Sequence, residues 1–203
     1  MANVTHTIYK GPSLFDGSPI VVWAQSNSGN SKTGDMVQTF IQNDSVDPLT
    51  ANRTGLDKAV CGDCIHKGTP NNNAKGQATD RTCYVTLAHA PLGKHKAYIK
   101  GKYPEAFGHN AIAAIGKGRM VRLGTFGDPA AVPNYIWESL LSESVGHTAY
   151  THGTVNPMPE SIMTSADSPI QAKQAWERGE RTFRVISSLD SVIKGKEVLC
   201  PAS

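Results

Sequence analysis

The sequence predicts an α/β protein whose mainly parallel sheet is arranged as a partial or irregular TIM-barrel-like fold. Short, strand-like apolar runs alternate with helical segments in the second half of the chain, which is typical of a parallel sheet with crossover helices. Some helical connections are missing, so a complete eight-fold barrel is not required. A chain of 203 residues is expected to form a single domain, 1–203, with residues 43–82 as a loop-rich insertion.

The predicted strands are short apolar or alternating runs bounded by turn residues. They are Pro19–Ala24, Thr82–Leu87, Met120–Phe126, His147–Thr151, Ser161–Ser165, Arg181–Ile186 and Glu197–Leu199. The run Asp35–Gln42 alternates only in part and fits either a strand or a helix. Helices are expected after Pro133 and over Ile170–Arg178, where Ser168 and Pro169 form a typical helix start.

Composition excludes two classes of protein. The chain has 20 Lys plus Arg and 17 Asp plus Glu, for a formal net charge of +3, and no run approaches the ~20 apolar residues of a membrane helix. Three Trp, six Tyr and five Phe argue against wholesale disorder. The small positive charge does not identify a nucleic-acid-binding protein. No export signal is visible at the start of the chain, so we expect a cytoplasmic protein without membrane partners.

The main candidate for a metal site is the set of four cysteines, Cys61, Cys64, Cys83 and Cys200. Disulfides are disfavoured in a reducing cytosol. The C-G-D-C turn brings two thiolates within reach of one ion, and Cys83 ends a polar segment that a shared metal would stabilise. Cys200 can close a tetrahedral site, although His66, His89 or water can take that place. The sequence therefore predicts a metal-stabilised, cysteine-rich insertion.

The spacing of these cysteines does not identify the metal, because all-thiolate sites suit zinc and iron–sulfur clusters alike. We expect zinc, with an iron–sulfur cluster as the alternative. Two other interpretations stay open: free thiols with no ligand role, and a C-x-x-C redox pair. A redox pair normally begins a helix after a strand, whereas a Gly-rich loop follows here.

Three polar residues follow predicted strands: Asp128, His152 and Asp167. In parallel α/β folds, functional side chains gather at the carboxyl ends of strands, so these residues are candidate catalytic groups. Asp128 would be the nucleophile or general base, Asp167 its acid/base partner, and His152 would position the substrate or transfer protons. The structural alternatives are helix capping or an Asx turn for the two carboxylates and simple packing for the histidine.

Several basic residues are candidates for contacts with substrate phosphates. Arg122 or Arg184 would bind a phosphate in bidentate fashion. The segment Lys94–Tyr103 concentrates four lysines and two tyrosines; its Lys94, Lys96 and Lys100 would contact phosphates beside stacking aromatics. The alternative is a solvated helix face with both tyrosines packed inward.

The order of motifs along the chain resembles that of a widespread family of bacteriophage proteins with no firmly established activity. The motifs are K-T-G-D-M-V-Q (Lys32–Gln38), C-G-D-C (Cys61–Cys64), C-Y-V (Cys83–Val85), R-L-G-T-F-G-D-P (Arg122–Pro129), A-Y-T-H (Ala149–His152), M-T-S-A-D-S (Met163–Ser168), R-T-F-R-V (Arg181–Val185) and C-P-A-S (Cys200–Ser203). This resemblance covers most of the chain from Lys32 onward and implies a protein that works in the cytoplasm of the host cell.

Two weaker resemblances imply specific chemistries. The C-x-x-C…C-Y pattern is similar to that of radical-SAM-like phage proteins, although 18 residues lie between Cys64 and Cys83. The segment Ile162–Val185 is similar in layout to part of the tRNA-guanine transglycosylases and their phage relatives that insert deazaguanines into DNA. Arg184 stands where those enzymes place a nucleophilic Asp, so Asp128 or Asp167 would take that role.

These observations give three hypotheses about function. The first is a metal-containing, nucleobase-modifying enzyme of transglycosylase type, with a nucleotide or DNA as substrate. The second is an iron–sulfur enzyme of radical-SAM type. The third is a phage-encoded binding module without catalysis, which sequesters a host factor or a nucleotide.

Overall fold

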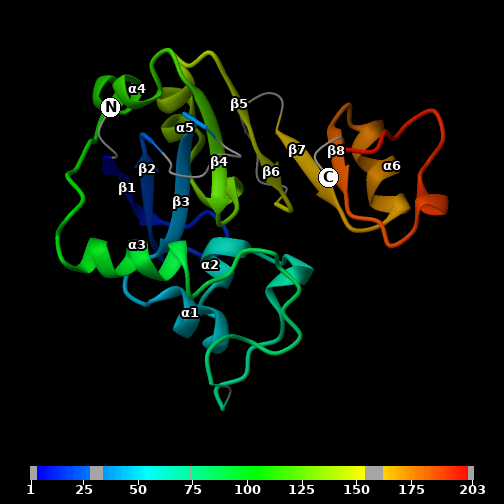
Figure 1. The fold of residues 1–203 in the computed structure, drawn as a ribbon, viewed down its shortest axis with the longest axis horizontal. Helices are drawn as coiled ribbons and strands as arrows, with labels where there is room; N and C mark the ends of the chain where they lie inside the picture. Colours follow the sequence, from blue (N-terminus) through cyan, green and yellow to red (C-terminus); the bar gives the residue numbers. More distant parts are fainter. Residues whose placement is uncertain (1–3, 28–33, 74, 154–161, 201–203) are drawn as a thin grey trace.

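The computed structural model describes residues 4–27, 34–73, 75–153 and 162–200, which form two open sheets with helices around them (Figure 1). The larger sheet has the strand order β1 (Thr5–Pro12), β2 (Pro19–Gln25), β3 (Val37–Asn43), β4 (Met120–Phe126), β5 (Gly146–Thr148). β1–β2 and β2–β3 pair antiparallel, whereas β3–β4 and β4–β5 pair parallel. The expected α/β class is confirmed, with a mixed sheet.

The smaller sheet is parallel and forms a lobe beside β5 (Figure 1). It consists of β6 (Tyr150–Thr151), β7 (Met163–Ala166) and β8 (Arg181–Arg184). Helix α6 (Pro169–Glu177) connects β7 to β8 and contacts both strands. Neither sheet closes on itself among the described residues, so the expected barrel-like closure is not seen there.

The core is built around the central strands of the larger sheet. Every residue of β3 is buried, and so is the run Ile20–Ala24 of β2, because these strands are covered on both faces. Helices α4 (His109–Gly116) and α5 (Asn134–Leu141) contact each other, and η2 (Pro129–Ala131) connects β4 to α5. Helix α3 (Ala90–Ile99) contributes Tyr98, whose ring lies 5.1 Å from that of Trp23.

Most sequence predictions of regular structure are confirmed, but two predicted strands are wrong, and the predicted strand His147–Thr151 is divided between β5 and β6, which belong to different sheets. β4 has the predicted bounds, and β2, α5, α6 and β8 differ from prediction by a few residues at their ends. Thr82–Leu87 is irregular, with a bend at Tyr84 and Val85, because the amides of Thr82 and Cys83 both donate to the carbonyl oxygen of His66 rather than to a strand. Glu197–Leu199 is also irregular. Ser161 of the predicted strand Ser161–Ser165 lies outside the described residues.

A buried asparagine holds the insertion 43–82 together. This segment contains α1 (Pro48–Thr54), α2 (Lys58–Cys61) and the 3-10 turn η1 (Ile65–Lys67). The Asn52 amide group donates to Asp57 Oδ2 at 2.7 Å and to the carbonyl oxygen of Lys67 at 2.8 Å. Its amide oxygen accepts from the N–H of Ala78 at 2.9 Å. Hydrogen bonds of Asn52 therefore link distant parts of this segment, for which the sequence suggested a stabilising metal.

Candidate metal centre and cavity

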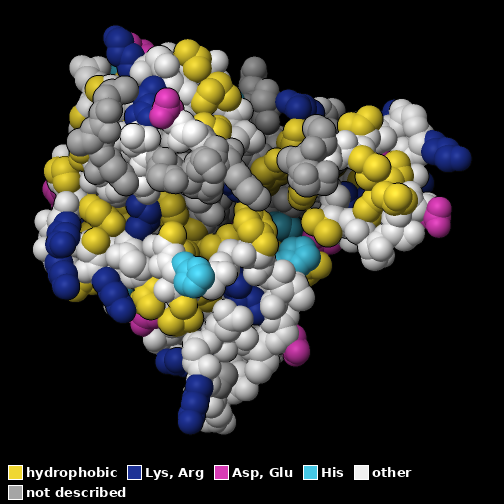
Figure 2. Space-filling view, viewed as in Figure 1, with side chains coloured by type: hydrophobic (Ala, Val, Ile, Leu, Met, Phe, Trp, Pro, Cys, Tyr) yellow, Lys and Arg dark blue, Asp and Glu magenta, His cyan; other side chains and the backbone are white. Residues whose placement is uncertain are grey.

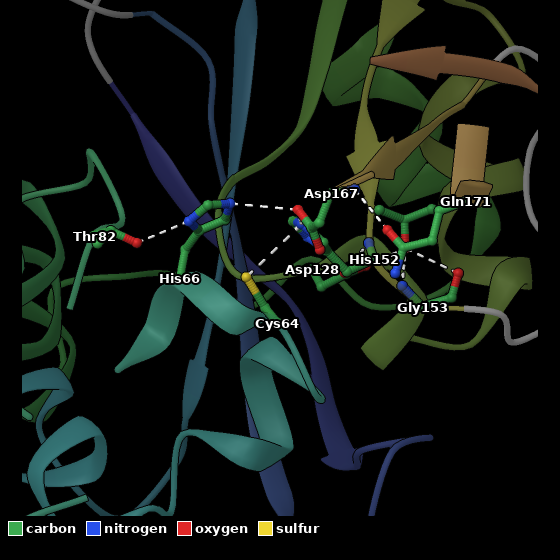
Figure 3. Close-up of polar contacts among 9 residues, drawn as sticks. Cys64, His66, Thr82, Asp128, His152, Gly153, Asp167 and Gln171 are labelled. Carbon is green, nitrogen blue, oxygen red and sulfur yellow. Dashed lines mark hydrogen bonds and ion pairs between the residues drawn. The ribbon is translucent and has the colours of Figure 1, made fainter. Parts of the chain in front are cut away.

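Two imidazoles and a carboxylate meet between the insertion and the smaller sheet (Figure 3). His66 comes from η1, His152 follows β6, and Asp167 follows β7. Asp167 Oδ1 lies 3.4 Å from His66 Nε2 and 3.5 Å from His152 Nε2. One donor atom from each residue lies within 4.8 Å of the other two. We call these three residues the His-His-Asp triad.

The spacing of the triad fits a single metal ion. Zinc–nitrogen and zinc–oxygen bonds of about 2.0–2.1 Å in a tetrahedral site put neighbouring ligand atoms about 3.4 Å apart. Both distances to Asp167 Oδ1 are close to that value. The side chains of His66, His152 and Asp167 are 32%, 24% and 19% exposed, so solvent reaches the triad. Imidazole and carboxylate donors suit zinc and other divalent transition metals.

A threonine orients His66 toward the other two residues. His66 Nδ1 and Thr82 Oγ1 are hydrogen-bonded at 2.8 Å, which leaves Nε2 facing Asp167 (Figure 3). The amides of Thr82 and Cys83 donate to the His66 carbonyl oxygen at 3.2 and 3.0 Å. Metal-binding histidines in proteins commonly have such a partner on the second ring nitrogen, because it fixes the tautomer and the ring orientation.

Asp128 positions His152 through the backbone. Its Oδ2 accepts from the N–H of His152 at 2.8 Å, and its Oδ1 accepts from Thr151 Oγ1 at 2.6 Å and from the N–H of Ala130 at 2.9 Å. Burial raises the pKa of Asp128, and these hydrogen bonds oppose the rise. The carboxylate predicted to be a nucleophile or base thus has both oxygens engaged by the protein.

Gly127 explains how Asp128 reaches this position. Its φ of 84° is left-handed, and a Cβ there would lie 2.7 Å from Ile41 Cβ and 2.8 Å from Val60 Cγ1. The following amide, that of Asp128, donates to the carbonyl oxygen of Val60 at 2.8 Å. Glycine therefore allows β4 to dock against α2, and the space beside Gly127 is filled by Ile41 and Val60 of the protein itself.

Asp167 has a different environment, because its neighbour takes over the capping role. Ser168 Oγ accepts from the N–H of Gln171 at 3.2 Å and caps α6, with Pro169 in the first turn, as predicted. The Asp167 backbone amide donates to Gln171 Oε1 at 2.6 Å. The Asp167 carboxylate remains available to the two imidazoles.

The expected four-cysteine site is not formed. Among the described residues, no three cysteine sulfurs lie within 4.8 Å of one another, the spacing that the triad meets. Cys61 ends α2 and Cys64 precedes η1. Cys64 Sγ instead lies 4.0 Å from His152 Nε2. The ligands that do converge are mainly histidine and aspartate, and the prediction of a four-thiolate site is corrected accordingly.

A cavity of about 680 Å³ adjoins the triad and is lined by all four cysteines as well as by His66, His152, Asp128 and Asp167. Burial raises the pKa of the Cys61 thiol well above its ordinary value, and nearby Asp57, Cys64, Cys83 and Asp128 raise it further. A second hollow of about 280 Å³ also reaches His66 and Asp167. Figure 2 shows imidazoles at the surface where the smaller lobe meets the rest of the protein.

The cavity wall combines cationic and aromatic groups. Lys67, Arg81 and Arg122 line it, together with Tyr84, Tyr150 and Phe183. The Arg122 guanidinium donates to the Tyr84 hydroxyl at 3.0 Å, and within the described part of the chain no carboxylate forms an ion pair with it. The rings of Tyr150 and Phe183 lie 4.9 Å apart.

The other predicted phosphate ligands lie elsewhere. Arg184 forms a bidentate ion pair with Glu197, at 2.8 and 2.7 Å, so its donors are already engaged. Lys94 lies 4.4 Å from the centroid of the Phe40 ring, and burial lowers its pKa to about 8. Lys96 and Lys100 are exposed on or just after α3, and none of these three lysines lines the cavity. The alternative interpretation of an ordinary helix with inward tyrosines is confirmed for α3 by Tyr98.

His66 was expected only as a substitute for Cys200, although it is a member of the triad. The signal was the C-x-H spacing of Cys64 and His66, which places both side chains at one short turn. Thr82, Tyr84 and Asn52 gave no recognisable signal, because each acts through contacts with distant segments.

No helix in the described part of the chain has the length and apolar content needed to cross a membrane. Comparison with protein-family models, with curated proteins and with solved structures finds no match for this chain.

Proposed function

We propose that this protein is a metal-dependent enzyme that acts on a nucleobase or nucleotide, with the His-His-Asp triad as its metal site. The observation that carries the proposal is the convergence of His66, His152 and Asp167 donor atoms within 4.8 Å at the edge of a large cavity. Three protein ligands leave room for water or substrate on a zinc-type ion, as in catalytic rather than structural zinc sites.

The cavity favours a substrate that has both an aromatic ring and an anionic group. The Arg122 guanidinium has no described carboxylate partner and can bind a phosphate through two parallel hydrogen bonds. Tyr84, Tyr150 and Phe183 offer ring faces on which a base can stack. A volume of about 680 Å³ is in the range of small-molecule sites.

The contacts of the two aspartates favour metal-assisted attack by water over a covalent transglycosylase mechanism. A bound divalent metal lowers the pKa of its water and supplies a nucleophile at neutral pH. Asp128 accepts three hydrogen bonds and holds His152, while Asp167 faces both imidazoles, so neither carboxylate stands free as a nucleophile. Thr82 and Asp128 then act as positioning residues for the two histidines.

A substrate screen tests this proposal. The protein is loaded with Zn²⁺, Mn²⁺, Co²⁺ or Fe²⁺ and incubated with nucleosides, nucleoside mono- to triphosphates and short oligonucleotides. We expect metal-dependent turnover of at least one nucleotide, a KM raised by roughly tenfold or more in Arg122→Gln, and no change in the matched control Lys96→Gln on exposed α3. Nucleotide binding without turnover under any metal would instead support the binding-module hypothesis.

A second candidate is the iron–sulfur enzyme, favoured by the observation that all four cysteines line the same cavity. Their sulfurs are too far apart for one ion, but a cluster spans a larger distance than a single metal atom does. Anaerobic purification with iron and acid-labile sulfide analysis tests it. Brown protein with stoichiometric iron and sulfide would favour this candidate, and colourless protein with a zinc ion would eliminate it.

A further inference from the structure

The geometry points to Cys64 as a fourth protein ligand of the metal held by the His-His-Asp triad, which makes the site selective for thiophilic metals. This inference rests on the proposed metal site and deepens it by naming an additional ligand and the class of metal. It makes one cysteine a metal ligand, whereas the sequence pattern suggested that all four cysteines bind a metal.

The position of Cys64 next to the triad is the first argument. Its Sγ lies 4.0 Å from His152 Nε2, the ring nitrogen that also faces Asp167 (Figure 3). With zinc–sulfur and zinc–nitrogen bonds of about 2.3 and 2.0–2.1 Å, a tetrahedral site puts sulfur and nitrogen about 3.6 Å apart. The sulfur is therefore within a few tenths of an ångström of that spacing from His152, but it lies outside the 4.8 Å grouping of the triad donors, so ligation requires the Cys64 side chain to turn toward Asp167 and His66.

Local structure lets Cys64 make that movement. Cys64 directly precedes η1, and its side chain forms no capping hydrogen bond with that turn. His66 lies two residues further on, so one short turn carries both the Cys64 side chain and a member of the triad. In the part of the chain that the structure describes, no other cysteine sulfur is hydrogen-bonded to a triad ring nitrogen, and Cys200, which also lines the cavity, is exposed.

The surroundings of Cys64 suit a metal-bound thiolate. Asp128 and Asp167 line the same cavity as Cys64, and a dication at the triad offsets the negative charge gathered there. Binding forms one metal–sulfur bond, breaks the S–H bond and releases the proton to solvent. Zinc can expand from four to five ligands, so water or substrate can still join.

Cobalt substitution tests the inference, because thiolate bound to Co²⁺ gives a sulfur-to-metal charge-transfer band in the near ultraviolet. The full-length wild-type protein, Cys64→Ser, Cys64→His and the control Cys83→Ser are titrated with Co²⁺. We expect a band of one-thiolate intensity in the wild type and in Cys83→Ser. We expect the band to be lost in both Cys64 variants, while the visible bands of bound Co²⁺ remain in Cys64→His.

Each other outcome has a definite meaning. Visible bands of bound Co²⁺ without the charge-transfer band in the wild type would overturn the role of Cys64 and leave the triad site intact. Intensity of two or more thiolates would overturn the assignment of one cysteine. No Co²⁺ binding at all would overturn both this inference and the proposed function. The wild-type spectrum decides these cases without relying on the folding of any variant.

Metal selectivity gives a second readout. Competition between Cd²⁺ and Mn²⁺ should favour Cd²⁺ strongly in the wild type, because thiolate prefers soft metals. The Cd²⁺ preference should fall in Cys64→Ser by more than the roughly 10–100-fold that loss of an outer-shell partner costs. An unchanged preference would contradict the role of Cys64.

Discussion

Two aspartates follow strands of the two neighbouring sheets, and their contacts differ sharply. Asp128, after β4, is 7% exposed and accepts hydrogen bonds from Thr151, Ala130 and His152. Asp167, after β7, is more exposed, and its carboxylate faces the ring nitrogens of His66 and His152. The two residues have the same place in the sequence pattern, but the first holds the backbone and the second can hold a ligand.

The difference shows what decides the role of a carboxylate at a strand end. Where backbone amides and a hydroxyl reach both oxygens, the carboxylate is part of the scaffold. Where a neighbouring residue caps the next helix, as Ser168 does here, the carboxylate is left for other partners.

Replacing Asp167 should weaken metal binding strongly and leave the fold intact. Asp167→Asn removes the charge that both imidazoles face, so we expect zinc affinity to fall by about 100-fold or more. The free energy of unfolding of the metal-free protein should change by less than about 1 kcal/mol, because partly exposed ion pairs contribute little. Calorimetric zinc titration and urea denaturation measure the two effects. Unchanged zinc affinity would remove Asp167 from the site.

Replacing Asp128 should have the opposite effect, with a large loss of stability in the metal-free protein. Asp128→Asn leaves donors of Thr151, Ala130 and His152 poorly matched in a buried place, so we expect the free energy of unfolding to fall by about 2–4 kcal/mol. Urea denaturation of the metal-free protein measures this, with exposed Asp63→Asn as the control. A stable variant that loses only activity would reverse our assignment and make Asp128 a catalytic residue.

Asn52 should behave like Asp128, because it is a second buried polar group with all its partners inside the protein. We expect Asn52→Ala to lower the free energy of unfolding by about 2–3 kcal/mol and to speed hydrogen exchange at the amide of Ala78. Removal of metal with a chelator should leave that amide protected. Exchange that responds to the chelator and not to the substitution would show that a metal holds the insertion, as the sequence had suggested.

Replacing Lys94 should change the free energy of unfolding least, and by an amount that depends on pH. Its folded-state pKa of about 8 lies below the ordinary 10.5, so the unfolded chain binds more protons between these values and stability rises with pH across that window. Lys94→Met removes the buried charge and also the contact with the Phe40 ring. We expect the free energy of unfolding of Lys94→Met to exceed that of the wild type by about 1–2 kcal/mol at pH 7, and this difference to disappear near pH 10.5.

Denaturation at several pH values, with exposed Lys96→Met as the control on the same helix, checks this prediction. A pH-independent difference between wild type and Lys94→Met would contradict it. Loss of nucleotide binding in that variant would return Lys94 to the phosphate-binding role that the sequence suggested.

Local patterns in the sequence predicted much of the fold. The β-branched run of β2 and the Ser168-Pro169 start of α6 each depend on neighbouring residues, so they could be recognised without the structure. The strand predicted at Thr82–Leu87 was wrong because its amides pair with His66, which lies in a separate turn. The antiparallel β1–β2–β3 part of the sheet also depended on pairings that periodicity does not specify.

The candidate site was predicted in part for the same reason. Strand-end positions identified His152 and Asp167, and the structure places them side by side. The cysteine pattern drew attention away from His66, whose partners Asp167 and Thr82 come from distant segments. Residue spacing along the chain cannot show which donors converge when the converging segments belong to different sheets and loops.

X-ray absorption at the zinc edge of the zinc-loaded protein tests the central claim most directly. We expect a first shell dominated by nitrogen and oxygen at about 2.0–2.1 Å, with outer-shell scattering from two imidazoles that weakens in His66→Ala and in His152→Ala. At most one sulfur at about 2.3 Å should accompany it. A shell of three or four sulfurs without imidazole scattering would contradict the account and restore the four-cysteine site.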